Sequence, residues 1–325
     1  MCTAITLKTE DFYFGRNLDY EFSYGEQIVL TPRNFSFAFR HEGERKNHLA
    51  ILGVAHVDSR YPLYYDAINE AGVGMAGLNF VGNAVYAEKM DPNKDNIAQF
   101  ELIPWILSQA RSAAEAKLLL QRINVMNTPF SDRFPASQLH YLIADQHSCL
   151  VLECVKEGIR VFDNPLGVLT NNPPFQEQLF WLNRYMSLSR KDPENNFGKD
   201  LNLTIYSRGM GALGLPGDLS SPSRFVKAAF TKLNSRSPTE EAPSVSQFFH
   251  ILQSVEQQRG VTQIGEDEFE ITIYSTCYNT AKRICYYTSY NNRRINAIRM
   301  DGENLDGHDL ITFPMRVAED IAYQN

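Results

Sequence analysis

The order in which strand-like and helix-like segments follow one another is the feature of this sequence that most restricts its fold. The first hundred residues read mainly as strands, and two helices follow. Strands return near residue 140, two or three helices come next, and the chain ends in strands again. This order fits layered antiparallel sheets with helices packed against them. Because there is no internal repeat and no long linker, we expect a single domain over residues 1–325.

The strand predictions rest on short runs rich in β-branched and aromatic residues. They cover Cys2–Lys8, Phe12–Tyr20, Gln27–Thr31, Phe35–Arg40, His48–His56, Val73–Phe80, Leu139–Asp145, Cys149–Lys156, Ile159–Asp163, Gly167–Thr170, Phe269–Tyr278, Arg283–Tyr290 and Ile295–Met300. The helix predictions rest on apolar spacing and cover Ala98–Ala110, Ala113–Ile123, Gln176–Ser189, Arg224–Asn234 and Val245–Arg259. Pro104 indicates that the first of these helices begins near it or is kinked there. Ser221 and Pro222 are suited to the N-cap and first position of the fourth helix, and residues 191–207 read as a polar loop.

Composition excludes several classes of protein. Apolar residues make up 43% and charged residues 21%, enough for a sizeable core and too little charge for wholesale disorder. The formal net charge of −7 argues against binding to nucleic acid or to an anionic membrane surface. No run approaches the ~18 apolar residues of a membrane span. The first residues show no signal peptide, so we expect a cytoplasmic protein.

Apart from the thiol of Cys2, the sequence contains no obvious catalytic nucleophile. There is no nucleophile elbow and no histidine pair with metal-ligand spacing, so we expect no metal. The segment Gly209–Gly214 matches the dinucleotide pattern of glycines, but Leu215 and Pro216 follow it where a helix should continue. We therefore interpret it as a loop and expect no organic cofactor. Four of the five cysteines lie within or at the edges of predicted strands and read as buried; Cys2 is set apart by its position.

Cys2 stands directly behind Met1. If Met1 is removed, one residue carries both a thiol and a free α-amine. The thiolate is the nucleophilic form of a thiol, and an ordinary α-amine, with a pKa of about 8, can accept a proton near neutrality. Nucleophile and general base would then share one residue. The alternative is that residue 2 merely begins an edge strand.

Polar residues at three predicted strand ends extend this hypothesis. A hairpin of 2–8 with 12–19 would place Arg16 or a neighbour beside Cys2, where a guanidinium favours thiolate, and Asp19 could bind the freed amine. The alternative is an exposed Arg–Asp pair of little energetic value. Asn79 and Asn171 each end an apolar strand, where amide groups can stabilise an oxyanion. Asn is also an ordinary strand terminator.

Five ordered blocks carry a resemblance to a known family. They are MCTAIT at the start, FGRNLDYE at 14–21, NEAGVGMAGLNF at 69–80, DNPLGVLTNNP at 163–173 and GLPGDLSSPSRF at 214–225. Over essentially its full length the chain resembles the choloylglycine hydrolase family of N-terminal-nucleophile amidases, and within it the bile salt hydrolase branch. The resemblance implies an α+β fold, the four-layer αββα sandwich with two antiparallel sheets flanked by helices.

The resemblance also implies roles for individual residues. Cys2 would be the nucleophile, with Arg16 and Asp19 assisting the thiol and the α-amine. Asn79 and Asn171 would hold the oxyanion, and Arg224 matches the remaining arginine of the site. An apolar pocket for the steroid would be lined by Leu18, Tyr65, Phe130, Phe134 and Leu139, with residues 129–134 as a mobile loop over it.

The substrates implied are conjugated bile salts with glycine or taurine, and family members commonly form homotetramers. The penicillin V acylases are the competing branch, but that branch tends to have Tyr where this chain has Asn79. A non-catalytic steroid binder would keep the aromatic pocket and tolerate loss of Cys2. An oxidoreductase would need a functional Gly209–Gly214 segment.

Overall fold

The structure, a computed structural model, describes residues 1–325 and consists mainly of two large antiparallel sheets. The first sheet contains, in spatial order, β14 (Val168–Leu169), β1 (Cys2–Lys8), β2 (Phe12–Tyr20), β16 (Glu268–Asn279), β17 (Ile284–Ser289) and β18 (Asn296–Arg299), with β15 (Thr262–Gly265) paired to β16. The second contains β13 (Gly158–Asp163), β12 (Cys149–Val155), β11 (Leu139–Ala144), β8 (Gly74–Asn79), β7 (Tyr61–Asn69), β6 (Ile51–Asp58), β3 (Gln27–Thr31) and β19 (Ile311–Pro314). Two small pairs stand apart, β4 (Phe37–Phe39) with β5 (Gly43–Arg45) and β9 (Asp95–Ala98) with β10 (Ile123–Met126).

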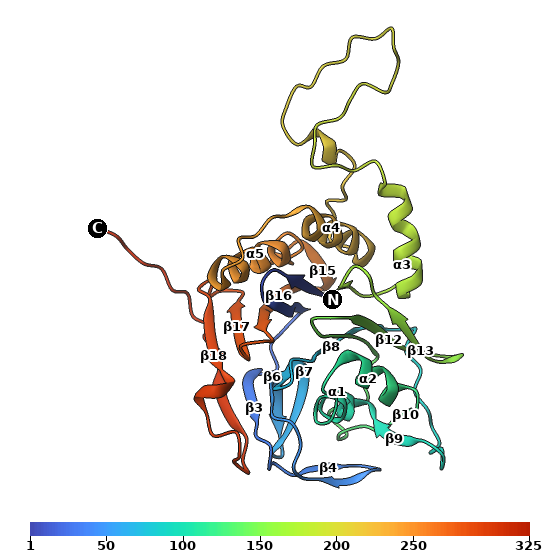
Figure 1. The fold of residues 1–325 in the computed structure, drawn as a ribbon, viewed down its shortest axis with the longest axis vertical. Helices are drawn as coiled ribbons and strands as arrows, with labels where there is room; N and C mark the ends of the chain where they lie inside the picture. The colour runs from blue at the N-terminus through green and yellow to red at the C-terminus, as the bar shows by residue number, and fades with distance from the viewer.

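Helices cover the outer faces of both sheets (Figure 1). The first sheet is covered by α4 (Ser221–Asn234) and α5 (Glu241–Gln253), and the second by α1 (Leu102–Leu107) and α2 (Ala113–Leu120). One apolar core packs against both faces of the first sheet, with α4 and α5 on one side and the second sheet on the other. Another core lies between the second sheet and helices α1 and α2. The predicted four-layer αββα arrangement is therefore confirmed.

The burial of β1 and β2 follows from their place in these layers. Every residue of β1 except Lys8 is buried, and so is every residue of β2 except Tyr20. Helices cover one face of these strands and the second sheet covers the other, so the side chains on both faces are buried. This explains why neither β1 nor β2 has a polar face toward solvent. Gly15 is required for close approach, because a Cβ there would lie 2.1 Å from the carbonyl oxygen of Thr276. Strand β1 pairs with β14 as well as β2, so the edge-strand alternative for residue 2 is wrong.

Several element boundaries differ from the prediction. Strand β7 (Tyr61–Asn69) was not predicted because Pro62 is its second residue and Asp66 interrupts its apolar run. Helix α1 begins at Leu102, so Pro104 lies in its first turn and causes no kink. Helix α4 begins at Ser221 and its N-cap is Ser220, one residue before the prediction.

Other predicted elements are shorter in the structure. The helix expected at 176–189 is α3 (Phe175–Trp181) followed by a 3₁₀ turn, and the strand expected at 35–40 contracts to β4. Strands β5, β9, β10, β15 and β19 were not predicted; each has three or four residues, too few for an alternating pattern to stand out.

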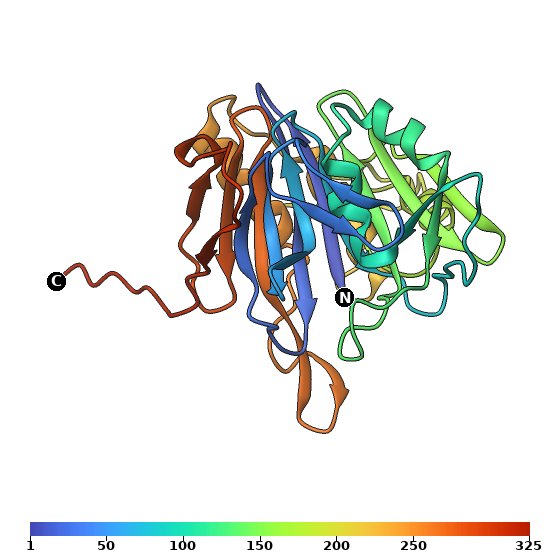
Figure 2. The same ribbon diagram turned by 90° about the horizontal axis from the view of Figure 1, so that it is seen from below.

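Two segments project from the layers. Residues 186–209 contain no helix or strand and extend away from α3 and α4 (Figure 1). The hairpin of β15 and β16 extends beyond the sheets on the side where the N-terminus lies (Figure 2).

Within Gly209–Gly214 only a short 3₁₀ turn forms, Met210–Ala212, with no strand before it; the loop interpretation is confirmed. The molecule has no helix with the length and apolar character needed to cross a membrane.

Candidate active site

The register of β1 against β2 distributes side chains to two faces. Cys2 lies opposite Leu18, and Ala4 opposite Arg16. Since side chains alternate along a strand, Cys2, Arg16 and Leu18 share the face that meets the second sheet. Asp19 lies on the opposite face, toward α4 and α5. Arg16 and Asp19 are both fully buried, so the alternative of an exposed Arg–Asp pair is wrong.

A cavity of about 300 Å³ opens on the face shared by Cys2, Arg16 and Leu18. Its walls are mostly apolar, and they include all the predicted pocket residues: Leu18, Tyr65, Phe130, Phe134 and Leu139. The loop over the cavity is closed by backbone hydrogen bonds, among them one from Phe130 N to Phe134 O at 3.0 Å. Sequence reasoning missed other lining residues: Tyr20, Tyr24, Glu26, His56, Leu63, Gln99 and Phe100.

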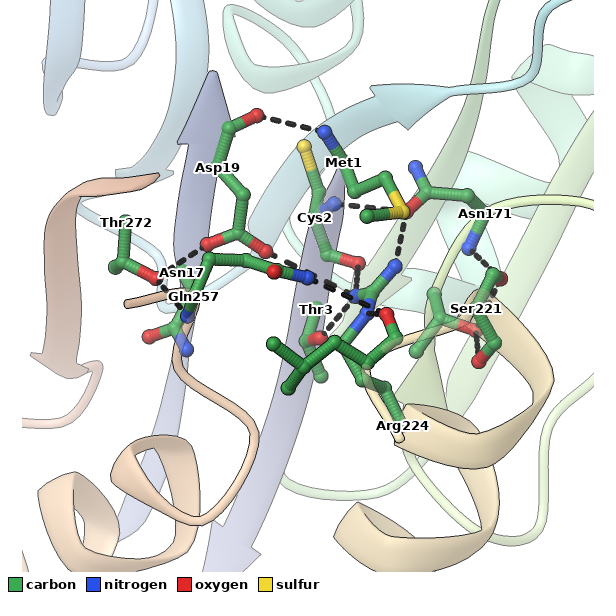
Figure 3. Close-up of polar contacts among 12 residues, drawn as sticks. Met1, Cys2, Thr3, Asn17, Asp19, Asn171, Ser221, Arg224, Gln257 and Thr272 are labelled. Carbon is green, nitrogen blue, oxygen red and sulfur yellow. Dashed lines mark hydrogen bonds and ion pairs between the residues drawn. The ribbon is translucent and has the colours of Figure 1, made fainter. Parts of the chain in front are cut away.

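Asn171 lies beside Cys2 (Figure 3) and links it to Asn79. The backbone N–H of Cys2 donates to Oδ1 of Asn171 at 2.7 Å. The amide Nδ2 of Asn171 donates to the backbone oxygen of Asn79 at 2.8 Å, which joins the end of β14 to the end of β8. Ser221 Oγ accepts from the backbone N–H of Asn171 at 2.8 Å and fixes this strand end against the first turn of α4. Asn79 also lines the cavity.

Arg224 binds the other side of Cys2. It lies on the buried face of α4 and is fully inaccessible. Its Nη1 donates to the backbone oxygen of Cys2 at 2.5 Å and to Thr3 Oγ1 at 2.6 Å, and its Nη2 donates to Asn171 Oδ1 at 2.8 Å. Burial lowers the pKa of Arg224, and the charges of Asp19 and Cys2 oppose this change. One guanidinium therefore joins β1, β14 and α4 around the N-terminus.

Asp19 supplies the carboxylate of this cluster. Its Oδ1 accepts from Thr272 Oγ1 at 2.6 Å, and its Oδ2 lies 3.8 Å from Arg224 Nη1. Burial raises the pKa of Asp19, while Arg224 and the nearby α-amine act in the opposite direction. Oδ2 is buried and accepts no hydrogen bond, so a further donor could be bound there at little cost.

Arg16 lines the cavity and has an unused donor. Its Nε donates to Asn17 O at 3.2 Å and its Nη1 to Gly77 O at 2.5 Å, whereas the buried Nη2 has no partner. Burial alone would lower the pKa of Arg16, but the negative charges around it, with Cys2 the largest contributor, raise it. A guanidinium with a free N–H beside a thiol stabilises the thiolate form.

The N-terminal amine is itself part of the cluster. In this chain it belongs to Met1, donates to the backbone oxygen of Asp19 at 2.8 Å and pairs with Glu270 on β16. Burial lowers the pKa of this α-amine despite the nearby carboxylate. A lowered pKa leaves more of the amine as free base near neutrality, which is the form that accepts a proton.

The other four cysteines are free thiols in a different environment. Burial raises the pKa of Cys149 and of Cys154 to about 12, and also raises the pKa of Cys277 and Cys285. None of them lines the cavity. No group of three or more His, Cys, Asp or Glu side chains is arranged to hold a metal ion.

The structure thus brings the predicted catalytic side chains together around the start of β1. Sequence reasoning missed Thr3, Ser221 and Thr272, which position Arg224, Asn171 and Asp19. Thr3 follows Cys2 directly and Ser221 lies within the GLPGDLSSPSRF block, so both could have been considered. Thr272 is 253 residues from Asp19 in the chain and carried no local signal.

Comparisons with known proteins agree along the whole chain. The model of a family described as linear amide C–N hydrolases, choloylglycine hydrolase family, matches residues 2–313. The chain is 52% identical to a bile salt hydrolase/transferase of Lactiplantibacillus plantarum, with 97% of each chain covered. It is 37% identical to a bile salt hydrolase/transferase of Clostridium perfringens, with 96% of each covered.

Solved structures show the same likeness. The chain superposes on a variant of the conjugated bile acid hydrolase of Clostridium perfringens with a TM-score of 0.93, at 36% identity and full coverage of both chains. It superposes on penicillin V acylase of Agrobacterium tumefaciens with a TM-score of 0.74, at 18% identity, covering 96% of this chain and 91% of that one. The second likeness shows the fold alone.

Proposed function

Because this chain belongs to the choloylglycine hydrolase family of linear amide C–N hydrolases, we propose that it is a bile salt hydrolase. It cleaves the amide bond between a bile acid and glycine or taurine. The observation that carries the proposal is the position of Cys2. Its side chain lines an apolar cavity with Arg16 and Asn79, while its backbone is held by Asn171 and Arg224.

Removal of Met1 is the first requirement of this proposal. While Met1 is attached, the nitrogen of Cys2 is a peptide N–H that donates to Asn171 and cannot accept a proton. Removal converts it into an α-amine in a buried, polar cluster. Asp19 Oδ2, which has no hydrogen-bond donor, is the acceptor that we assign to the protonated amine.

The reaction then proceeds in two steps. The α-amine of Cys2 takes the thiol proton, and the thiolate attacks the amide carbon of the substrate. Nδ2 groups of Asn79 and Asn171 stabilise the tetrahedral oxyanion, and Arg16 stabilises the thiolate. The protonated amine gives its proton to the departing glycine or taurine nitrogen as the C–N bond breaks. Water hydrolyses the remaining thioester, returning a free thiol and a bile acid.

The apolar cavity is suited to the steroid part of the substrate. Leu18, Tyr65, Phe130, Phe134 and Leu139 form a wide hydrophobic wall, and a rigid apolar ligand needs such a wall with few polar groups. Under this proposal the steroid occupies the cavity, and the amide lies beside the buried Cys2.

Acyl transfer is a second activity that the same intermediate permits. Two relatives carry the name bile salt hydrolase/transferase. An amine that reaches the Cys2 thioester before water does would accept the bile acyl group and form a new amide. We propose this as a side reaction, detectable when a free amino acid is added to the hydrolysis mixture and new conjugates are sought by mass spectrometry.

Assembly and location are further parts of the proposal. Residues 191–207 project from the layers and expose Phe197 and Tyr206, at 84% and 80% of their surface. Exposed apolar side chains on a protruding segment favour a contact between copies of the chain, and we propose a homotetramer built through it. The five free cysteines favour a reducing compartment such as the cytoplasm.

A kinetic panel tests the function. Glycocholate, taurocholate and penicillin V are compared at equal concentration with the Met1-free protein. We expect turnover of both bile salts and little of penicillin V, since Asn79 occupies the position that tends to be Tyr in penicillin V acylases. Faster turnover of penicillin V than of either bile salt would favour the acylase alternative. Binding of bile salts without any turnover would favour the non-catalytic steroid binder.

A further inference from the structure

Asp66 is a fully buried carboxylate between the two sheets. It lies on β7 of the second sheet, while its three hydroxyl partners lie on β16 of the first. Tyr274 donates to Oδ1 at 2.5 Å, and Thr276 and Tyr278 donate to Oδ2 at 2.9 and 2.7 Å. The three partners occupy alternate positions of β16, so they present one face of that strand to β7. No atom of this carboxylate reaches solvent or touches the cavity.

Thr276 connects this carboxylate to Arg16. The backbone N–H of Arg16 donates to Thr276 Oγ1 at 3.2 Å. A hydroxyl has one proton, and because its oxygen accepts from Arg16, that proton is donated to Asp66. The chain from Arg16 through Thr276 to Asp66 is therefore directional and ends on Oδ2 of Asp66 as the acceptor.

The guanidinium of Arg16 lies against the same part of the second sheet. Its Nη1 donates to Gly77 O, and also to Tyr65 O at 3.4 Å. Tyr65 precedes Asp66, and Gly77 follows the residue that pairs with Asp66 across β7 and β8. Arg16 and Asp66 form no ion pair within 4 Å, so the carboxylate acts on the guanidinium through its field and on the backbone of Arg16 through Thr276.

The acidic groups around Arg16 come from four strands. They are the thiol of Cys2 on β1, the carboxyls of Asp19 on β2 and Asp66 on β7, and the phenol of Tyr274 on β16, which stays protonated because burial raises its pKa well above the ordinary value. A buried guanidinium needs compensating charge and full hydrogen bonding. Asp66 is the carboxylate that the second sheet contributes, and it forms no hydrogen bond with Nη2, which has no partner.

We propose that Asp66 is a positioning residue for the reaction, holding Arg16 beside the sulfur of Cys2 through Thr276. This inference rests on the proposed function, because it assigns Arg16 to the thiolate of an amide hydrolase. Asp66 touches neither substrate nor cavity in this role. Its effect reaches the chemistry only through Arg16.

Four variants separate positioning from general packing. Asp66→Asn removes the charge at nearly constant shape. Thr276→Val cuts the connection to Arg16 and leaves every charge in place, and Thr276→Ser keeps the hydroxyl and serves as the rescue. Tyr278→Phe is the matched control, since it also removes one donor to Asp66 but has no bond to Arg16.

Two readouts are measured on Met1-free protein. The first is kcat and KM for taurocholate. The second needs no substrate: the rate of iodoacetamide alkylation at Cys2 as a function of pH, followed by peptide-resolved mass spectrometry. For Asp66→Asn and Thr276→Val we expect kcat to fall about 10²-fold with little change in KM. We also expect the alkylation midpoint to rise by about one pH unit, with both values restored in Thr276→Ser and unchanged in Tyr278→Phe.

The direction of the pH shift decides the outcome. Loss of a negative charge by itself favours an ionised thiol and lowers the midpoint, whereas displacement of Arg16 raises it. A lowered or unchanged midpoint with wild-type kcat in Asp66→Asn overturns the proposal, as does an equal loss in Tyr278→Phe. If Asp66→Asn does not fold, Thr276→Val decides alone. If wild-type protein alkylates normally but cleaves no bile salt, the proposed function fails while the alkylation series still tests Asp66.

Discussion

The backbone nitrogen of Cys2 lies 2.7 Å from the side-chain oxygen of Asn171, although 169 residues separate them in the chain. The same oxygen accepts from Arg224 at 2.8 Å. An acceptor shared by the Cys2 nitrogen and a buried guanidinium fixes where Cys2 lies. Activity should therefore depend on whether the Cys2 nitrogen is a peptide N–H or a free α-amine.

An N-terminal extension should abolish hydrolysis. A short tag placed ahead of Met1 keeps the Cys2 nitrogen in a peptide bond, so no amine can take the thiol proton. Loss of a general base typically costs about 10²–10⁴ in rate. The measurement is glycine release from glycocholate, with a C-terminal tag as the control. Protease cleavage directly before Cys2 should restore activity; a tagged protein that turns over at the wild-type rate would disprove the shared-residue mechanism.

Replacing the nucleophile should separate binding from chemistry. Cys2→Ala removes the sulfur but leaves the backbone contacts with Asn171 and Arg224 in place. We expect turnover to fall by about 10⁶-fold, the order seen when a hydrolase loses its nucleophile, with the melting temperature unchanged within a few degrees. Taurocholate affinity, measured by calorimetry, should persist. Hydrolysis by the folded variant at the wild-type rate would contradict the role of Cys2.

Asn171→Asp isolates the oxyanion contribution. An aspartate oxygen accepts from Cys2 and Arg224 as the asparagine oxygen does, but the second oxygen cannot donate to a developing oxyanion. The expected result is a fall in kcat of about 10²–10³-fold, together with a lower melting temperature, because the new oxygen meets the Asn79 carbonyl oxygen to which Nδ2 donates in the wild type. Single-turnover measurements should place the loss in the acylation step. Equal losses in stability and rate would indicate that Asn171 acts by holding the strand end alone.

Arg224→Gln should affect both stability and activity. It leaves Asp19 as a buried carboxylate with only Thr272 as a partner and leaves the Cys2 carbonyl without its donor. Removing one partner of a buried ion pair costs about 3–5 kcal/mol of unfolding free energy. Urea unfolding monitored by tryptophan fluorescence measures this loss. Arg224→Lys, which keeps the charge but loses the two-pronged geometry, should recover part of the stability and little of the activity.

How far the sequence predicts this molecule depends on the range of the interaction involved. The long strands around Cys2–Lys8 and Phe12–Tyr20 were predicted because local apolar runs specify them, and the hairpin register then places Arg16 on the Cys2 side. The meeting of Cys2 with Asn171 and Arg224 could be predicted only through family resemblance. No local pattern encodes contacts between residues more than 160 positions apart.

The parts that sequence reasoning missed share a physical cause. Asp66 interrupts an otherwise apolar strand, and a buried charge inside β7 makes that segment read as a loop until its three hydroxyl donors are seen. Thr272 likewise has no signal in its own neighbourhood. The Asp66 carboxylate is satisfied by partners on β16, and the Thr272 hydroxyl by Asp19 on β2 and the backbone N–H of Gln257; such compensation is visible only in three dimensions.

Lys232 provides a prediction that concerns stability rather than catalysis. This side chain on α4 donates to Thr6 Oγ1 at 3.0 Å and to the carbonyl oxygens of Leu166 and Gly167. Burial lowers its pKa from 10.5 to about 8. Between these two values the unfolded chain binds a proton that the folded chain does not, so the free energy of unfolding rises with pH in this window. Below about pH 8 both states are protonated and the penalty is constant.

The expected result is a pH-dependent difference between wild type and Lys232→Met. Relative to the variant, wild type should gain up to about 3 kcal/mol of unfolding free energy between pH 8 and pH 10.5. Urea unfolding at about pH 7, 9 and 10 measures the difference, and subtraction removes the contribution of other titrating groups. Lys227→Met, on the same helix, is the matched control because the Lys227 amine has no hydrogen-bond or ion-pair partner. A wild-type advantage that stays constant or shrinks with rising pH would show that Lys232 keeps its proton in the folded state.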